Sequence, residues 1–201
     1  MKIITISGLD GSGKSTQVEM LKNYLESQNK RVFYFHAIEQ SIAKKTINFR
    51  NKYCLVCKLS KKCETSPSVT RANVFQIFLR KIFLRIDAWR FNRLRNKLRN
   101  LGYDYILSDR YFYDSAINIE YLSESQYEVP FLVSPDMRIY LQASPEFIMH
   151  RERVPDQGID YLKKKNELYD NKINVWNMKV VNGNRDKNVI FEEIQGLVPS
   201  S

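Results

Sequence analysis

The chain alternates short apolar runs with longer segments in which apolar residues recur every three or four positions. The short runs are rich in β-branched and aromatic residues and predict buried strands at residues 2–7, 31–36, 104–108, 137–141 and 180–181. The longer segments predict helices at residues 17–27, 38–49, 71–100, 115–122, 159–176 and 189–194, with one more that starts at Ser144-Pro145-Glu146. Because strands alternate with helices, we expect a three-layer α/β fold with helices on both faces of a parallel sheet.

The segment between the first strand and the first helix is rich in glycine and reads Gly8-Leu9-Asp10-Gly11-Ser12-Gly13-Lys14-Ser15. It matches the phosphate-loop pattern of Gly, four residues, then Gly-Lys-Ser/Thr. The glycines let backbone N–H groups surround an anion, and the helix start adds the positive end of its dipole. The side chain of Lys14 can reach outer phosphates, and the hydroxyl of Ser15 can bind Mg²⁺. This context predicts a nucleotide site in a P-loop NTPase fold.

The 201 residues and the 43% hydrophobic content suit a single domain with a real core. The net charge of +10 suits anionic ligands, either nucleotides or nucleic acid, and does not choose between them. Many basic residues are spread over all faces of the helix expected at 71–100, which favours a solvated surface over a helix that reads nucleic acid. No apolar run is long enough to span a membrane, and the start of the chain does not resemble a signal peptide. We expect a cytoplasmic protein without membrane contact.

Two further groups of charged residues are candidates for phosphate chemistry. Asp109-Arg110 follows a strand, so the Asp can hold Mg²⁺ and the Arg can grip a phosphate, unless the two form only a structural ion pair. Arg151-Glu152-Arg153 precedes a short loop with Pro155 and Gly158. We expect a small basic lid at residues 151–160 that closes over the phosphates, and the alternative is an ordinary charged surface.

Three cysteines lie in a polar insert at residues 51–70. Their spacing, Cys54-x2-Cys57-x5-Cys63, contains half of a zinc knuckle. A structural Zn²⁺ would need a fourth ligand, for which His36 or a carboxylate such as Glu64 could serve. The alternative is a set of reduced thiols, because a disulfide is disfavoured in the cytosol.

These motifs together resemble the thymidylate kinase family. Residues 8–16 are similar to its phosphate loop, including the acid at Asp10, and Asp109-Arg110-Tyr111 is similar to its second signature. The resemblance covers residues 1–36 and roughly 82–196, and includes Tyr140-Leu141, Ser144-Pro145-Glu146, the two arginines of the expected lid and residues 161–169.

The resemblance implies transfer of a phosphate from ATP, with Mg²⁺, to a nucleoside monophosphate on a homodimer. It implies that ATP phosphates bind to Gly8, Gly11, Ser12, Gly13, Lys14, Ser15 and Thr16, and that Mg²⁺ binds to Ser15 and Asp109. The acceptor would contact Asp10, Arg90, Asp109, Arg110, Ser115 and Asn118, although Arg85 could replace Arg90. The expected catalytic residues are Asp10, Lys14, Arg110, Arg151 and Arg153.

The chain also departs from the family pattern in the acceptor region. Ala37-Ile38-Glu39-Gln40-Ser41 stands where the family has Arg-Glu-Pro-Gly-Gly-Thr, and Asn118 stands where the family has a Tyr. The expected acceptor is dTMP, and another monophosphate is the next choice. Two further hypotheses are a kinase for a polynucleotide 5′-end, suggested by the net charge, and a nucleotide-binding module without catalytic activity.

Overall fold

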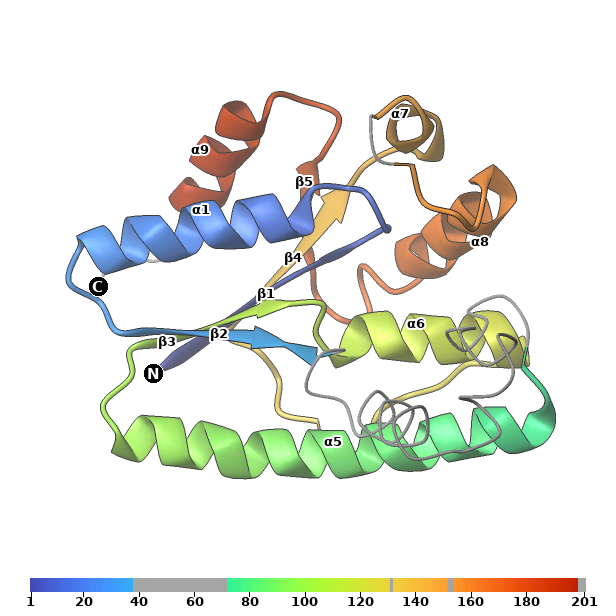
Figure 1. Cartoon of the computed structure of the whole chain (residues 1–201), viewed down its shortest axis with the longest axis horizontal. Coiled ribbons are helices and arrows are strands. Elements are labelled where there is room, and N and C mark those ends of the chain that lie inside the picture. The colour runs from blue at the N-terminus through green and yellow to red at the C-terminus, as the bar shows by residue number, and fades with distance from the viewer. Residues whose placement is uncertain (38–71, 131, 152–153, 199–201) are drawn as a thin grey trace, which may run out of the picture.

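The central feature of the molecule is a five-stranded sheet, seen in a computed structural model that describes residues 1–37, 72–130, 132–151 and 154–198 (Figure 1). The strands are β1 (Lys2–Gly8), β2 (Val32–His36), β3 (Tyr105–Asp109), β4 (Met137–Gln142) and β5 (Lys179–Asn182). All neighbours pair in parallel, in the order β2-β3-β1-β4-β5. The parallel sheet predicted from the apolar runs is confirmed.

The register of the sheet brings the functional segments to one edge. Ile6 of β1 lies opposite Asp109 of β3, and Gly8 lies opposite Leu141 of β4. Because parallel strands end at the same edge, the phosphate loop after β1 and Asp109-Arg110 after β3 emerge side by side. This edge is where α/β proteins bind ligands.

Helices cover both faces of the sheet, as expected. On one face lie α1 (Lys14–Ser27) and α9 (Lys187–Leu197), and on the other lie α5 (Val74–Asn100) and α6 (Phe112–Ser123) (Figure 1). Two further helices, α7 (Pro145–Met149) and α8 (Ile159–Asp170), follow β4. The ring of Tyr169 in α8 stacks on the ring of Tyr140 in β4, with 4.9 Å between centroids. That stack fixes α8 against the sheet.

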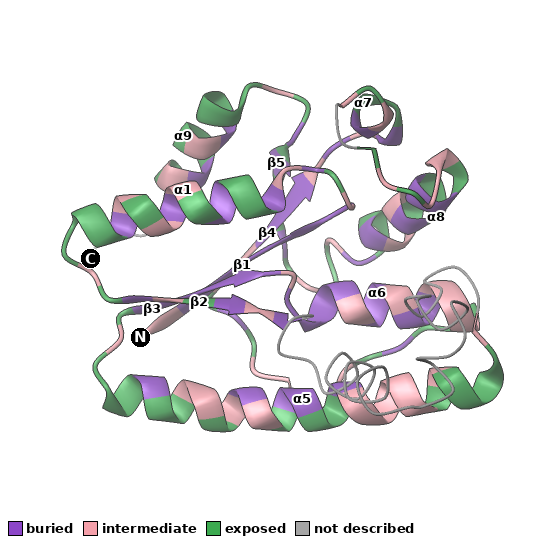
Figure 2. Ribbon diagram, viewed as in Figure 1, coloured by how far each residue is buried: buried purple, intermediate pink, exposed green. Residues whose placement is uncertain are grey.

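The core consists of two clusters, one on each face of the sheet. Figure 2 shows the buried residues of the strands and of the helices that cover them. Successive strand residues point to opposite faces, so Ile4 and Ile6 of β1 pack with α1 and α9 while Ile3 packs on the other face. The second cluster is rich in aromatic rings, among them Phe35, Phe91, Tyr111, Phe112, Tyr140 and Tyr169. Ring contacts in this cluster join β2 to α5 and α6, and β4 to α8.

Several helix boundaries differ from those expected. The helix α5 begins at Val74 because Asn73 caps it: its side chain accepts a hydrogen bond from the backbone N–H of Gln76 at 3.0 Å. The helix expected at 159–176 ends at Asp170, and the next residues form turns in which Trp176 stacks on Tyr113 of α6 at 4.5 Å. The last helix is longer than expected because Asp186 caps its start. The helix expected at 38–49 lies outside the described residues.

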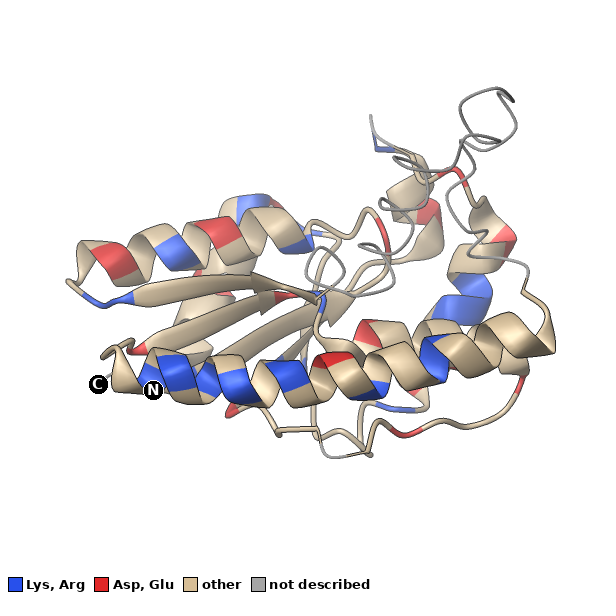
Figure 3. Ribbon diagram, turned by 60° about the horizontal axis from the view of Figure 1, so that its bottom comes forward, with Lys and Arg blue, Asp and Glu red and all other residues tan. Residues whose placement is uncertain are grey.

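Lysine and arginine residues occur along α5 from Arg80 to Arg99 (Figure 3). Some have partners within the helix: Arg93 lies over the Trp89 ring at 4.4 Å, and Arg90 pairs with Asp87 at 3.2 Å. Among the helices in the described ranges, none has the length and apolar character needed to cross a membrane.

The cluster beneath α1 gives a test of the packing. Leu21 is fully buried against the sheet, whereas Val189 of α9 is 45% exposed. Because Leu21→Ala removes buried methyl groups and leaves a cavity, it should lower the free energy of unfolding by about 2–5 kcal/mol. Val189→Ala should change it by less than about 0.5 kcal/mol. Urea titration followed by circular dichroism measures both, and equal effects would contradict the assignment of this core.

Candidate active site

The phosphate loop connects β1 to α1 through backbone conformations that require glycine. Gly13 has a φ of 97° and is the N-cap of α1, which begins at Lys14. A Cβ atom at Gly8 would lie 2.6 Å from the carbonyl oxygen of Leu141. Since the first N–H groups of a helix have no partner within it, they are available to an anion at this loop. The strand–loop–helix context predicted from the pattern is confirmed.

Lys14 is buried within this loop. Its ammonium donates hydrogen bonds to the carbonyl oxygens of Gly8 at 3.0 Å and Leu9 at 2.6 Å. Burial, followed by the positive charge of Arg110, lowers the pKa of Lys14 to about 8. A bound phosphate would offer the ammonium a negative charge that two neutral carbonyls do not supply.

Ser15 and Asp109 meet at the start of α1. The Ser15 hydroxyl donates to Oδ2 of Asp109 at 2.5 Å, and the Tyr34 hydroxyl donates to the same oxygen at 3.3 Å. The other oxygen, Oδ1, is buried and has no hydrogen-bond partner in the described part of the chain. A hydroxyl beside a carboxylate with a free oxygen fits Mg²⁺, which prefers oxygen ligands.

Asp10, the acidic residue of the loop, is shared by two cations from different elements. Its Oδ1 lies 2.5 Å from Nη1 of Arg110, and its Oδ2 lies 3.4 Å from Nζ of Lys165 in α8. Burial alone would raise the pKa of Asp10, but Lys165, Arg110 and Lys14 hold it well below its usual value. The guanidinium of Arg110 is partly exposed beside the loop, so a phosphate could reach it.

The sequence analysis did not single out Lys165, the last of three consecutive lysines beyond the expected lid. The three lysines point to different partners: Lys163 pairs with Glu146 at 3.2 Å and Lys164 with Glu124 at 3.3 Å, both at the surface. Lys165 is fully buried. The signal was its helical spacing from Tyr161, Leu162 and Tyr169, which form the buried face of α8.

Asp114 in the first turn of α6 is a second residue that sequence reasoning missed. It is fully buried. Its negative charge favours the protonated forms of Lys14, Arg110 and Lys165, and so raises the pKa of each against the effect of burial. The site thus contains a buried network of three cations and several carboxylates at the carboxyl edge of the sheet.

Arg151 lies across the phosphate loop. Its Nη1 donates to the carbonyl oxygen of Gly11 at 2.7 Å, and its Nη2 donates to that of Gly183 at 3.3 Å. Its guanidinium also lies over the ring of Phe147, 5.0 Å from the centroid. The neighbouring lid candidate, Arg153, lies outside the described residues, so the lid expected at 151–160 is described only in part.

Arg90 lines a small cavity on the α5 side of the sheet. The cavity has a volume of about 180 Å³ and is lined by Phe35, Ala37, Asp87, Arg90, Phe91, Leu94 and Phe112. Arg85, the alternative to Arg90, is exposed and is not a lining residue. Ser115 and Asn118 of α6 do not line it either, and the Asn118 side chain accepts a hydrogen bond from the Tyr161 hydroxyl at 3.5 Å.

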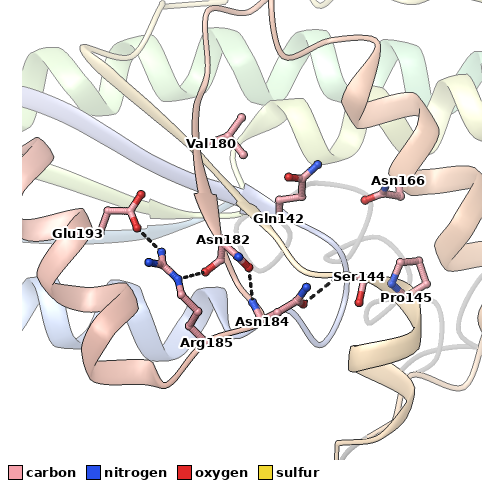
Figure 4. Close-up of a pocket in the computed structure, with 9 residues that line it drawn as sticks. All are labelled: Gln142, Ser144, Pro145, Asn166, Val180, Asn182, Asn184, Arg185 and Glu193. Atoms are coloured by element: carbon pink, nitrogen blue, oxygen red, sulfur yellow. Dashed lines mark hydrogen bonds and ion pairs between the residues drawn. The ribbon is translucent and has the colours of Figure 1, made fainter.

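A second cavity, of about 480 Å³, lies beside β5 and was not expected from the sequence (Figure 4). Several amide side chains line this cavity. The Asn184 side chain accepts a hydrogen bond from the backbone N–H of Ser144 at 2.9 Å. The backbone N–H of Asn184 donates to the side chain of Asn182 at 2.9 Å. The residue between the two asparagines is Gly183, which binds Arg151. One arginine therefore links the wall of this cavity to the phosphate loop.

The three cysteines proposed as zinc ligands, Cys54, Cys57 and Cys63, all lie outside the described residues, as does Glu64. Within the described ranges, no group of three or more His, Cys, Asp or Glu residues could hold a metal ion. The zinc site therefore stays a prediction.

The all-parallel sheet, the helices on both faces and the phosphate loop after the central strand define an α/β protein of the P-loop kinase fold. No family model matches the chain. The chain is 22% identical to the thymidylate kinase of Thermosipho africanus over a 215-residue alignment that covers 97% of this chain and 96% of that protein. It is 23% identical to the thymidylate kinase of Thermosipho melanesiensis over 205 residues, with the same coverage. These similarities support a nucleotide kinase function.

The pKa of Lys14 leads to a pH dependence of nucleotide binding. Below about pH 8 the Lys14 ammonium is charged. Above that pH the free protein loses this proton, and with it the positive charge that attracts a phosphate. The affinity for ADP should therefore be constant at lower pH and fall up to about tenfold per pH unit above the pKa. Calorimetric titration with ADP between about pH 7.5 and about pH 9.5 measures this. An affinity that does not change over this range, in protein that stays folded, would contradict the assignment.

Proposed function

We propose that the protein transfers the γ-phosphate of ATP to a nucleoside monophosphate, with dTMP as the first choice of acceptor. The observation that carries the proposal is the arrangement of Lys14 and Arg110, two cations that both act on Asp10 at one edge of the sheet. One suits the phosphates of a donor bound at the loop, and the other suits the phosphate of an acceptor. Two relatives named thymidylate kinase, aligned over nearly the whole chain, support the choice of dTMP.

Each residue of the site has a role in this reaction. The loop N–H groups, Lys14 and Thr16 hold the donor phosphates, and Ser15 and Asp109 hold Mg²⁺, which neutralises phosphate charge when bound. Arg110 binds the acceptor phosphate through its guanidinium. Because phosphoryl transfer depends on positioning and charge stabilisation, the site needs these cations more than it needs a strong base.

Arg151 has the best position to stabilise the transferred phosphoryl group. It contacts the loop at Gly11, directly beside the residues that would hold the donor phosphates. A guanidinium at this place can neutralise charge that develops in the transition state. Arg153 is the second candidate for this role.

The cavity that Arg90 lines suits the base of the acceptor. Phe35, Phe91 and Phe112 give it aromatic walls, against which a flat ring can stack. The Arg90 guanidinium can donate hydrogen bonds to carbonyl oxygens such as those of thymine. Ser115 and Asn118 are the remaining candidates for acceptor contacts, and the homodimer implied by the resemblance stays a prediction.

A panel of acceptors tests the proposed reaction. ADP formation should be stimulated by dTMP or another single monophosphate in the presence of ATP and Mg²⁺, and a coupled assay measures it. The panel includes the common deoxy- and ribonucleoside monophosphates and a 5′-hydroxyl oligonucleotide. ATP binding without stimulation by any acceptor would overturn the proposal in favour of a nucleotide-binding module. Stimulation by the oligonucleotide alone would overturn it in favour of a polynucleotide kinase.

The lid arginines are tested by substitution. Arg151→Ala and Arg153→Ala, alone or together, should lower turnover by about 10²- to 10⁵-fold, because a cation that acts in the transition state is lost. ATP affinity should change much less. Arg99→Ala is the control, because Arg99 is exposed in the last turn of α5, which leads to the amino edge of the sheet. Unchanged turnover in the double variant would remove both arginines from the mechanism.

A further inference from the structure

The position of Asp10 poses an electrostatic problem. A carboxylate beside a phosphate site repels the ligand. Its ion pair with Arg110 also compensates the positive charge that would attract the acceptor phosphate. If Asp10 and Arg110 stood alone, the pair would be neutral. Lys14 and Asp114 add one charge of each sign, and Asp109 adds one more negative charge.

Lys165 adds a positive charge on the buried side of Asp10. Its ammonium pairs with the oxygen of Asp10 that Arg110 leaves free, at 3.4 Å. The side chain has no exposed surface, so it cannot meet a substrate in this conformation. With Lys165 present, the group of Asp10, Arg110 and Lys165 has a net positive charge.

The surroundings of Lys165 hold it in this place. Its ammonium lies over the ring of Tyr161, 5.4 Å from the centroid, and the Tyr161 hydroxyl bonds to Asn118 of α6. One turn further along α8, Tyr169 stacks on Tyr140 of the sheet. These contacts hold α8 in place and keep Lys165 directed at the phosphate loop.

We propose that Lys165 is a positioning residue for the acceptor phosphate. It pairs with one oxygen of Asp10 and compensates its charge, while the other oxygen fixes Arg110. The positive charge of Arg110 then remains available to attract the acceptor phosphate. This role rests on the proposed kinase function. The alternative is a purely structural ion pair, whose loss would destabilise the fold without a preference for one substrate.

The chain contains a matched control for that alternative. Lys172 forms a buried ion pair with Glu120 at 3.0 Å, and its ammonium lies over the Trp176 ring at 5.7 Å, much as Lys165 lies over Tyr161. Lys172→Met thus breaks a similar pair that does not involve Asp10. The comparison separates a loss of stability from a loss of acceptor binding.

The first experiment compares steady-state kinetics of Lys165→Met, Lys165→Arg and Lys172→Met with the acceptor found for the wild type. Lys165→Met should lower kcat/KM for the acceptor by about 10- to 100-fold, the range found when the partner that orients a functional group is removed. The acceptor KM should rise while the ATP KM stays unchanged. Lys165→Arg should recover part of the loss, and Lys172→Met should leave both KM values unchanged.

The second experiment measures kcat/KM against pH. The titratable groups around Asp10 and Arg110 come from four elements. They are Lys165 and Tyr161 of α8, Lys14 of α1, Asp114 of α6 and Asp109 at the end of β3. Asp10 must be ionised to hold Arg110, so activity is lost as the pH falls through its pKa. Without Lys165 that pKa rises towards its usual range, so Lys165→Met should lose more activity than the wild type as the pH falls below about 5. The substrate phosphate titrates in the wild-type and the variant profile alike, so the difference between the two profiles reports on the protein.

The double variant Asp10→Asn/Lys165→Met tests whether Lys165 acts through Asp10. In the Asp10→Asn background, Lys165→Met should have little further effect on the acceptor KM, because the charge that it neutralises is absent. Should Lys165→Met alone fail to fold, this neutral pair and Lys165→Arg still give the measurement. A full additional loss in the double variant, or a Lys165→Met profile that matches that of Lys172→Met, would overturn the proposal while the kinase activity stands. A wild type that phosphorylates no acceptor would instead overturn the proposed function.

Discussion

One shared carboxylate organises the candidate site. Asp10 is ionised in a largely buried position because two cations, Lys165 and Arg110, approach its two oxygens from different directions. Each of the three groups belongs to a different segment: the loop after β1, the end of β3 and the middle of α8. The negative charge of Asp10 is compensated only when these segments are packed together, because an unpaired buried charge is strongly unfavourable. The geometry of the site therefore depends on the completed fold.

The parts of the fold that local sequence determines were predictable. The strands follow from apolar runs, and the phosphate loop follows from a fixed order of glycine, lysine and serine. Boundaries set by tertiary contacts were not predictable in the same way. Helix α8 ends at Asp170 rather than near Trp176, and the aromatic stack of Trp176 on Tyr113 accompanies the turns that replace its last part.

The same distinction holds within the site. Lys14, Ser15, Asp109 and Arg110 belong to short motifs, and the sequence brought them to notice. Lys165 is 155 positions from Asp10, and nothing in its neighbourhood marks it as different from the two surface lysines before it. Only the phase of the helix separates them: Lys165 shares the spacing of Tyr161, Leu162 and Tyr169, and the packing of α8 identifies that face as the buried one. For α5, the same knowledge distinguishes Arg90, which lines a cavity, from the exposed Arg85.

The order of the strands also has a consequence for how the chain is made. Among the described strands, β1 pairs with β3 and β4, and β2 pairs with β3. A nascent chain that ends before Tyr105 thus contains two strands and no partner for either. Until then the apolar side chains of Ile3, Ile4 and Ile6 have no sheet to join, and contacts so distant in sequence form slowly. The strand that leads into the phosphate loop is therefore synthesised before either of the strands that pair with it.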